Sequence, residues 1–104
     1  MATGYITVPR KFSEEIANKI VEERLAACVN IVECKSIYKW DGNMQTENES
    51  IIIVKTSEDA FQEMVLRVKE LSPYEISCIE KFDESWIDME FKEWRDEFVR
   101  MRKR

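Results

Sequence analysis

The spacing of the apolar residues switches repeatedly between the period of a strand and that of a helix, and the order of these switches restricts the fold. The first segment is a short predicted strand, Tyr5–Val8, ended by Pro9. Ser13 follows as the expected N-cap of a helix, because its hydroxyl can accept a hydrogen bond from a free backbone N–H of the first turn. The apolar stripe of this predicted helix consists of Ile16, Ala17, Ile20, Val21, Leu25 and Cys28.

The middle of the chain is predicted to form a long hairpin. Apolar and aromatic side chains lie there at both odd and even positions, which is typical of a strand with two packed faces. Asp41-Gly42-Asn43 predicts the turn, since glycine tolerates a positive φ. The returning strand runs towards Lys55-Thr56 through the β-branched run Ile51–Val54. The alternating residues of the outgoing strand are Val29, Ile31 and Ile37 at odd positions and Cys34, Tyr38 and Trp40 at even positions.

The rest of the chain predicts a helix, a strand and a final helix. Ser57 is the expected cap of the first of these helices, and Ser72-Pro73 ends it. A strand is expected at about Glu75 to Phe82. The buried stripe of the first helix is Phe61, Met64, Val65, Val68 and Leu71. The last helix carries an apolar seam for packing on another surface, made of Ile87, Phe91, Trp94, Phe98 and Met101.

The predicted order, β-α-β-β-α-β followed by a C-terminal helix, is the split βαβ or ferredoxin-like arrangement of the α+β class. With 104 residues and no linker-like stretch, we expect a single domain over residues 1–104. Two helices cover one face of the four-stranded antiparallel sheet in this fold. Because the strands carry apolar side chains on both faces, the last helix or another subunit must cover the second face. The edges of the long hairpin also need protection, so we expect an oligomer.

The composition excludes several classes of function. The chain has no histidine, which removes the commonest general base and the commonest metal ligand. It has two glycines, too few for a phosphate-cradling loop. With 16 basic and 21 acidic residues the formal charge is −5, so the domain is a poor ligand for a nucleic-acid backbone. No apolar run is long enough to span a membrane. We expect neither nucleic acid nor membrane as a partner.

The cysteines indicate the compartment. Cys28, Cys34 and Cys78 are an odd and sparse set without a Cys-x-x-Cys pair, which favours free thiols in a reducing compartment. The N-terminal residues lack a signal pattern, so a cytoplasmic location is predicted. Because no histidine can activate a thiol and the carboxylates are not tied to a pocket by any motif, we expect a protein that is not an enzyme.

Four segments carry a resemblance to a known family, in matching order and spacing. They are Leu-Ala-Ala-Cys-Val-Asn-Ile at Leu25–Ile31, Ser-Ile-Tyr-Lys-Trp-Asp-Gly at Ser36–Gly42, Glu49 followed by Lys55-Thr56, and Ser-Pro-Tyr-Glu-Ile at Ser72–Ile76. Together they resemble the CutA-type divalent-cation (copper) tolerance proteins, over nearly the whole chain.

This resemblance implies a ferredoxin-like subunit in a tight homotrimer, in which sheet edges pair between subunits. It implies an architecture similar to the nitrogen-regulatory PII-type trimers, and binding of copper or another divalent cation in a response to metal ions. No cofactor is obligatory and no enzyme activity is established for the family. In one departure, Ser72 stands where the family usually has a histidine. A serine hydroxyl is a poorer copper ligand than an imidazole, so we expect weaker copper binding.

The resemblance also assigns residues to a cleft between subunits. Cys28 and Glu75 are the candidate metal ligands, although Cys28 is also typical of a small buried hydrophobe. The polar cleft residues could bind a small ion or form a structural ion-pair network between subunits, and the aromatic ones could be interface core. The cleft residues are Tyr38, Trp40, Glu49, Lys55, Ser72, Tyr74 and Glu75.

The cysteines cannot form a joint site within one predicted subunit. Cys28 and Cys34 lie about 20 Å apart along the same strand. Cys78 lies on the opposite edge of the predicted sheet from Cys28, so only a neighbouring subunit could bring these two thiols together. A two-cysteine site would therefore require a second chain.

Two functions follow as hypotheses. The first is equilibrium binding of a divalent or soft metal ion by thiolate and carboxylate at the inter-subunit clefts. The alternative is a PII-like regulatory or scaffold trimer that binds a small molecule or an unidentified protein partner, its metal site lost with the change to serine at Ser72.

Overall fold

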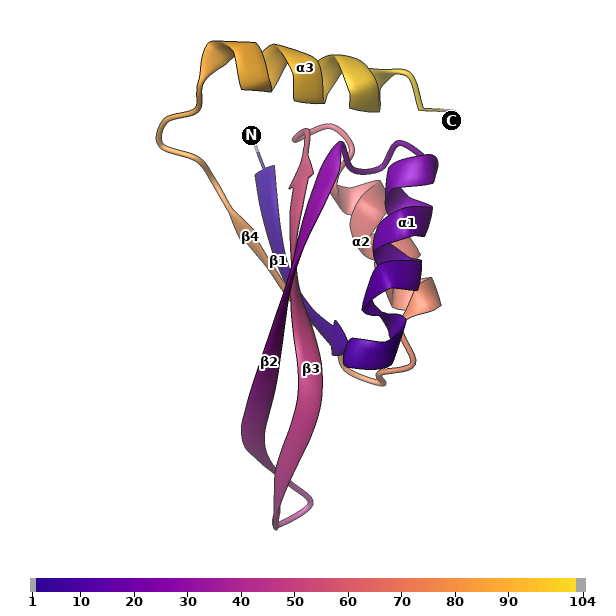
Figure 1. The fold of residues 1–104 in the computed structure, drawn as a ribbon, viewed down its shortest axis with the longest axis vertical. Coiled ribbons are helices and arrows are strands. Elements are labelled where there is room, and N and C mark those ends of the chain that lie inside the picture. The colour runs from indigo at the N-terminus through magenta and orange to yellow at the C-terminus, as the bar shows by residue number, and fades with distance from the viewer. Residues whose placement is uncertain (1, 103–104) are drawn as a thin grey trace.

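The computed structural model describes residues 2–102 and shows an α+β domain of the predicted ferredoxin-like order (Figure 1). The sheet has the strand order β2-β3-β1-β4, and each pair of neighbouring strands is antiparallel. No helix within residues 2–102 is long and apolar enough to cross a membrane. The elements are β1 (Ala2–Pro9), the 3-10 turn η1 (Arg10–Phe12), α1 (Ser13–Glu22), β2 (Cys28–Trp40), β3 (Asn43–Thr56), α2 (Phe61–Leu71), β4 (Cys78–Phe82) and α3 (Met89–Arg100).

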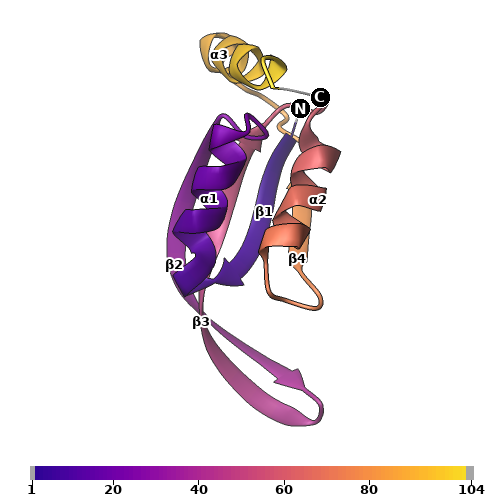
Figure 2. The ribbon, with the colours of Figure 1, turned by 90° about the vertical axis from the view of Figure 1, so that its right-hand side faces the viewer.

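The hydrophobic core lies between the sheet and the helices α1 and α2, which both cover the same face (Figure 2). The predicted stripe of the second helix is confirmed as the helix side of this core. The first predicted stripe is confirmed only for its residues within α1, because this helix ends at Glu22, so that Leu25 lies in the following loop and Cys28 begins β2. Gly4 of β1 allows α2 to approach closely, since a Cβ there would lie 3.3 Å from the Met64 side chain. The strands contribute alternate residues to the core, namely Ala2, Ile6 and Val8 of β1 and Ile52 and Val54 of β3.

The predicted hairpin is confirmed along its whole length. Strands β2 and β3 pair continuously from Cys28 opposite Lys55 to Trp40 opposite Asn43. Asp41 and Gly42 at the turn both have positive φ, 50° and 79°, as a tight hairpin of the primed type requires. Because β1 ends opposite Glu49, the distal part of the hairpin projects beyond the sheet as a two-stranded arm (Figure 1).

The ends of several elements differ from the sequence-based expectation. Ser13 is not the N-cap of α1, because η1 precedes the helix and the Ser13 hydroxyl instead donates to the Arg10 carbonyl at 2.9 Å. The Ser57 hydroxyl accepts from the N–H of Ala60, as a cap does, but it closes a turn and α2 begins only at Phe61. β1 starts earlier than predicted and is longer, whereas β4 starts at Cys78 and is shorter. The pairing of each with a neighbouring strand sets these ends.

The C-terminal helix α3 lies across the end of the sheet where β1 begins, far from the hairpin turn (Figure 1). It faces the rest of the chain with Val99 and with Arg95, which is 1% exposed and pairs with Glu84 at 2.9 Å. The predicted seam faces the rest of the chain only in part: Phe91 and Trp94 are exposed and stack on each other, whereas Phe98 packs against a buried cluster. Because α3 lies across the end of the sheet, it does not cover the second sheet face, as the last helix was expected to do if no other subunit did.

Candidate functional site

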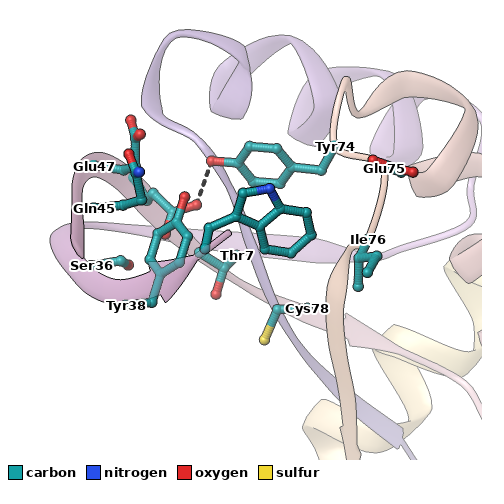
Figure 3. Close-up of a pocket in the computed structure, with 11 residues that line it drawn as sticks. Thr7, Ser36, Tyr38, Gln45, Glu47, Tyr74, Glu75, Ile76 and Cys78 are labelled. Atoms are coloured by element: carbon teal, nitrogen blue, oxygen red, sulfur yellow. Dashed lines mark hydrogen bonds between the residues drawn. The ribbon is translucent and has the colours of Figure 1, made fainter. Parts of the chain in front are cut away.

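A pocket of about 580 Å³ lies on the helix-free face of the sheet, at the base of the hairpin arm. The segment 74–76 between α2 and β4 forms one wall, and the strands form the others (Figure 3). We refer to it as the open-face pocket. Its lining residues are Thr7, Ser36, Tyr38, Trp40, Gln45, Glu47, Glu49, Tyr74, Glu75, Ile76 and Cys78.

Strand register explains why these side chains share one face. Residues directly opposite each other in an antiparallel pair point to the same side of a sheet. Ser36 lies opposite Glu47 in the hairpin, and Tyr38 lies opposite Gln45. Their alternate neighbours, by the same rule, point to the side that α1 and α2 cover. The pocket is thus assembled from every second residue of the arm, with its wall supplied by a distant loop.

Tyr74 and Glu49 form the central polar contact of the pocket. The Tyr74 hydroxyl donates to a carboxylate oxygen of Glu49, which is 6% exposed (Figure 3). Burial and this hydrogen bond to a carboxylate raise the pKa of Tyr74 above the ordinary tyrosine value. The loop is held by Ser72, whose hydroxyl accepts from the N–H of Tyr74 at 3.3 Å.

Tyr38 faces the same group of carboxylates from the arm (Figure 3). Desolvation raises the pKa of Tyr38, and the negative charges of Glu47 and Glu49 raise it further. Both tyrosines therefore stay protonated and neutral over a wide pH range.

The charged side chains that line the pocket are acidic. The carboxylates of Glu47, Glu49 and Glu75 line it, while no lysine or arginine within residues 2–102 does. Arg10 comes nearest along the fold, because its guanidinium donates to the Cys34 carbonyl at 2.8 Å. Its charge is directed to the helix side of the sheet, where it pairs with Glu33 at 3.6 Å. The open-face pocket is therefore acidic as well as aromatic.

The structure brings five of the sequence-predicted cleft residues into this pocket and leaves two outside it. Tyr38, Trp40, Glu49, Tyr74 and Glu75 line it. Lys55 and Ser72 lie outside it.

Lys55 lies six residues beyond Glu49 on β3, opposite Thr3 and Cys28, so about 20 Å of strand separates it from the pocket. Within one subunit Lys55 cannot share an ion-pair network with Glu49. Ser72 is 8% exposed, and it supports the loop through its hydrogen bond with the N–H of Tyr74.

The cysteines occupy separate places. Cys28 starts the edge strand β2 and is partly buried, whereas Cys78 starts the opposite edge strand β4, as predicted. Cys78, and not Cys28, lines the open-face pocket. The two candidate metal ligands Cys28 and Glu75 do not meet within one subunit.

Sequence reasoning missed several lining residues. Ser36, Gln45 and Glu47 could have been found from the turn, since Asp41-Gly42 sets the hairpin register and the register sets the shared face. Thr7 and Cys78 required the strand order, which no local pattern contains.

The donor set does not amount to a complete metal site in one subunit. Within residues 2–102 no group of three His, Cys, Asp or Glu side chains is placed to hold an ion. The carboxylates and the Cys78 thiol are ligand types that divalent ions accept, but they are spread along the pocket wall. An ion would need further donors from a second chain.

Comparisons with known proteins give one consistent result. A family model described as "CutA1 divalent ion tolerance protein" matches residues 2–98. The "Divalent-cation tolerance protein CutA" of Thermus thermophilus is 42% identical over 91 residues, covering 86% of this chain and 88% of the relative.

Solved structures agree with the sequence comparison. The structure of the "Periplasmic divalent cation tolerance protein CutA" from Archaeoglobus fulgidus superposes with a TM-score of 0.90 at 38% identity, covering 95% of this chain and 99% of that one. The "PII-like protein CutA" from Nostoc superposes with a TM-score of 0.91 at 28% identity, covering 95% and 97%.

Proposed function

The chain belongs to the CutA1 divalent ion tolerance family, and on that basis we propose that it is a homotrimer that binds cations at equilibrium in clefts between subunits. The observation that carries the proposal is the acidic open-face pocket, whose lining includes Glu47, Glu49 and Glu75 and, among residues 2–102, no lysine or arginine. Such a pocket attracts cations and repels anions.

The uncovered sheet face supports the assembly. Val32 and Phe82 on this face are 48% and 50% exposed, and Ile51 and Ile53 lie between them, half-buried. Apolar surface of this kind is stabilised when another subunit covers it. The edge strands β2 and β4 each have one unpaired edge within the subunit, which a second chain can pair.

Copper or another divalent ion would be held by donors from two subunits. Glu75 and Cys78 lie on one side of a subunit, and Cys28 lies on the opposite edge strand. Carboxylates suit hard divalent ions, and a thiolate adds affinity for soft ones. No cofactor is required for binding of this kind, and with no histidine available as a base we propose no turnover.

The three free cysteines fit a reducing compartment, so we propose a cytoplasmic location.

A PII-like regulatory or scaffold role is the second candidate. Two observations favour it: the pocket is much larger than a bare ion needs, and α3 displays an exposed aromatic row of Phe91 and Trp94. The pocket would take a small molecule and the row would contact a protein partner.

The first test measures assembly and ion binding together. Light scattering should give about three times the subunit mass of 12.4 kDa. Calorimetry with Cu(II), Zn(II) and Cd(II) should show binding that Glu75→Gln and Cys28→Ser each weaken, while Glu15→Gln, on the exposed side of α1, leaves it unchanged. A monomer at micromolar concentration, or ion binding indifferent to both variants, would contradict the proposal.

A double-mutant cycle tests whether the cleft crosses a subunit boundary. Lys55 and Glu75 are far apart within one subunit, so any coupling between Lys55→Ala and Glu75→Gln must act between chains. Thermal unfolding of both variants and the double variant measures it. Additive effects would show that Lys55 does not interact with Glu75 and is not a cleft residue.

A further inference from the structure

The side chains that line the open-face pocket indicate which kind of cation it binds. Its walls combine the carboxylates of Glu47, Glu49 and Glu75 with aromatic side chains. The aromatic residues are Tyr38, Trp40 and Tyr74. Aromatic rings contribute nothing to the coordination of a divalent metal ion, but their faces attract organic cations strongly.

Three ligand classes fit this lining poorly. Anions meet three carboxylates and no basic side chain among the described residues. A neutral apolar molecule would strip water from those carboxylates without compensation. A bare metal ion would need further donors from a second chain, and the pocket of about 580 Å³ is far larger than the ion.

We propose that the open-face pocket binds a small organic cation, a quaternary or protonated amine, whose charge is balanced by Glu47 and Glu49 and whose alkyl groups pack on Tyr38 and Trp40. This inference rests on the proposed function in taking this pocket as the ligand site. It replaces the metal ion with an amine as the ligand of the pocket itself.

The Tyr74–Glu49 contact prepares the site. Glu49 is nearly buried, and the Tyr74 hydroxyl holds one of its oxygens in place. Because Tyr74 and Tyr38 both have raised pKa values, neither ring acquires its own charge at neutral pH. Preorganised carboxylate and neutral ring faces are what an alkylammonium group needs, since such a group donates few or no hydrogen bonds.

The decisive experiment compares two ligands of equal shape. Choline and its neutral carbon isostere dimethylbutanol differ only in the charge of the head group. We expect calorimetry on the assembled protein at neutral pH and low salt to show binding of choline at least tenfold tighter than that of the isostere. Added salt should weaken choline binding because it screens the carboxylates. Equal affinity for the two, or no binding of choline, would overturn the inference.

Two variants locate the binding. Trp40→Leu keeps an apolar side chain but removes the ring face, and it should weaken choline about three- to thirtyfold. Glu47→Gln, at an exposed strand position where folding is little affected, should weaken choline several-fold and leave the isostere unchanged. Glu15→Gln removes the same charge on the other side of the molecule and is the matched control. If Glu47→Gln and Glu15→Gln act alike, choline is not in this pocket and the inference fails.

Titration with Cd(II) separates this inference from the proposed function. Cd(II) binding that depends on Glu75, together with no choline binding, would leave the family function standing and overturn the amine ligand. Choline binding that depends on Glu47, in protein that shows no Cd(II) uptake, would support the amine ligand and contradict the metal-binding function.

Discussion

The two faces of the sheet are built from alternate residues of the same strands, yet they differ in every chemical respect. On β3, Ile52 and Val54 point to the helices and are fully buried, while Glu49 and Ile53 point to the other side. The covered face is aliphatic and is closed by helices of its own chain. The open face mixes apolar, aromatic and acidic side chains and carries the pocket. A chain can thus use one strand both to build its core and to present a binding surface.

The helices explain the difference. α1 and α2 each return across the same side of the sheet, as the split βαβ connection requires, so both apolar stripes pack against the same face. The loop after α2 passes round the strand ends and brings Tyr74 to the opposite face. The segment that reaches over the open face in this way also walls the pocket.

The largest effect is expected for removing buried volume from the covered face. Ile52→Ala should lower the free energy of unfolding by about 3 kcal/mol, because the cavity lies between the sheet and both helices. Its neighbour Ile53 supplies the control on the open face. Ile53→Ala should cost less at high protein concentration and show an effect that grows on dilution, if subunits cover this face. Denaturant titrations at two concentrations measure both. Equal, concentration-independent losses would show that the two faces do not differ in what covers them.

The next largest loss of stability is expected for the contact that holds α3 at the end of the sheet, away from the open face. Arg95 is buried against Glu84, and removing one partner of a buried pair leaves the other charge uncompensated. Arg95→Met should cost about 3 kcal/mol or somewhat less, since Glu84 is near the surface. Arg100→Met on the exposed side of α3 is the matched control and should have little effect. Hydrogen exchange of α3 amides would reveal undocking, and unchanged protection in Arg95→Met would show that the contacts of Phe98 and Val99 hold the helix without Arg95.

A smaller effect is expected for the contact that shapes the pocket. Tyr74→Phe removes the hydroxyl that donates to Glu49 and should cost about 1 kcal/mol, discounted because Tyr74 is only half-buried. Tyr5→Phe on the same face, where the ring packs on Phe82, serves as control. Thermal unfolding compares them. Identical melting shifts would mean that the Tyr74–Glu49 hydrogen bond adds nothing to stability.

The smallest effect appears only at alkaline pH. The folded pKa of Tyr74 is raised above the value of 10.0 for a free tyrosine, chiefly by burial and then by Glu49. Stability from the protonated hydroxyl is therefore fully present below pH 10 and is lost as the pH rises through the folded pKa. An ultraviolet titration should show late-ionising tyrosines in the native protein, and Tyr74→Phe should remove the latest of these ionisations. An unchanged titration curve in the variant would contradict the raised pKa.

Much of the candidate site could be predicted, because family resemblance and hairpin register both act over short stretches of chain. Strand parity places Tyr38 and Trp40 on one face of the arm, and both line the open-face pocket. Lys55 could not be excluded in advance, since its distance from Glu75 depends on where the loop after α2 crosses the sheet. Glu47 was overlooked although the Asp41-Gly42 turn aligns it with Ser36.

Local patterns were sufficient for the types and order of the elements, the two buried helical stripes and the hairpin turn. These features depend on side-chain period and on the φ angles a residue tolerates, and both are properties of neighbouring residues. The meeting of Tyr74 with Glu49 and of Arg95 with Glu84, by contrast, came from the folded arrangement. Contacts of this kind form between residues that no short-range periodicity relates. They exist because strand order and loop path bring distant side chains to the same face, where burial strengthens whatever charge or hydrogen bond they share.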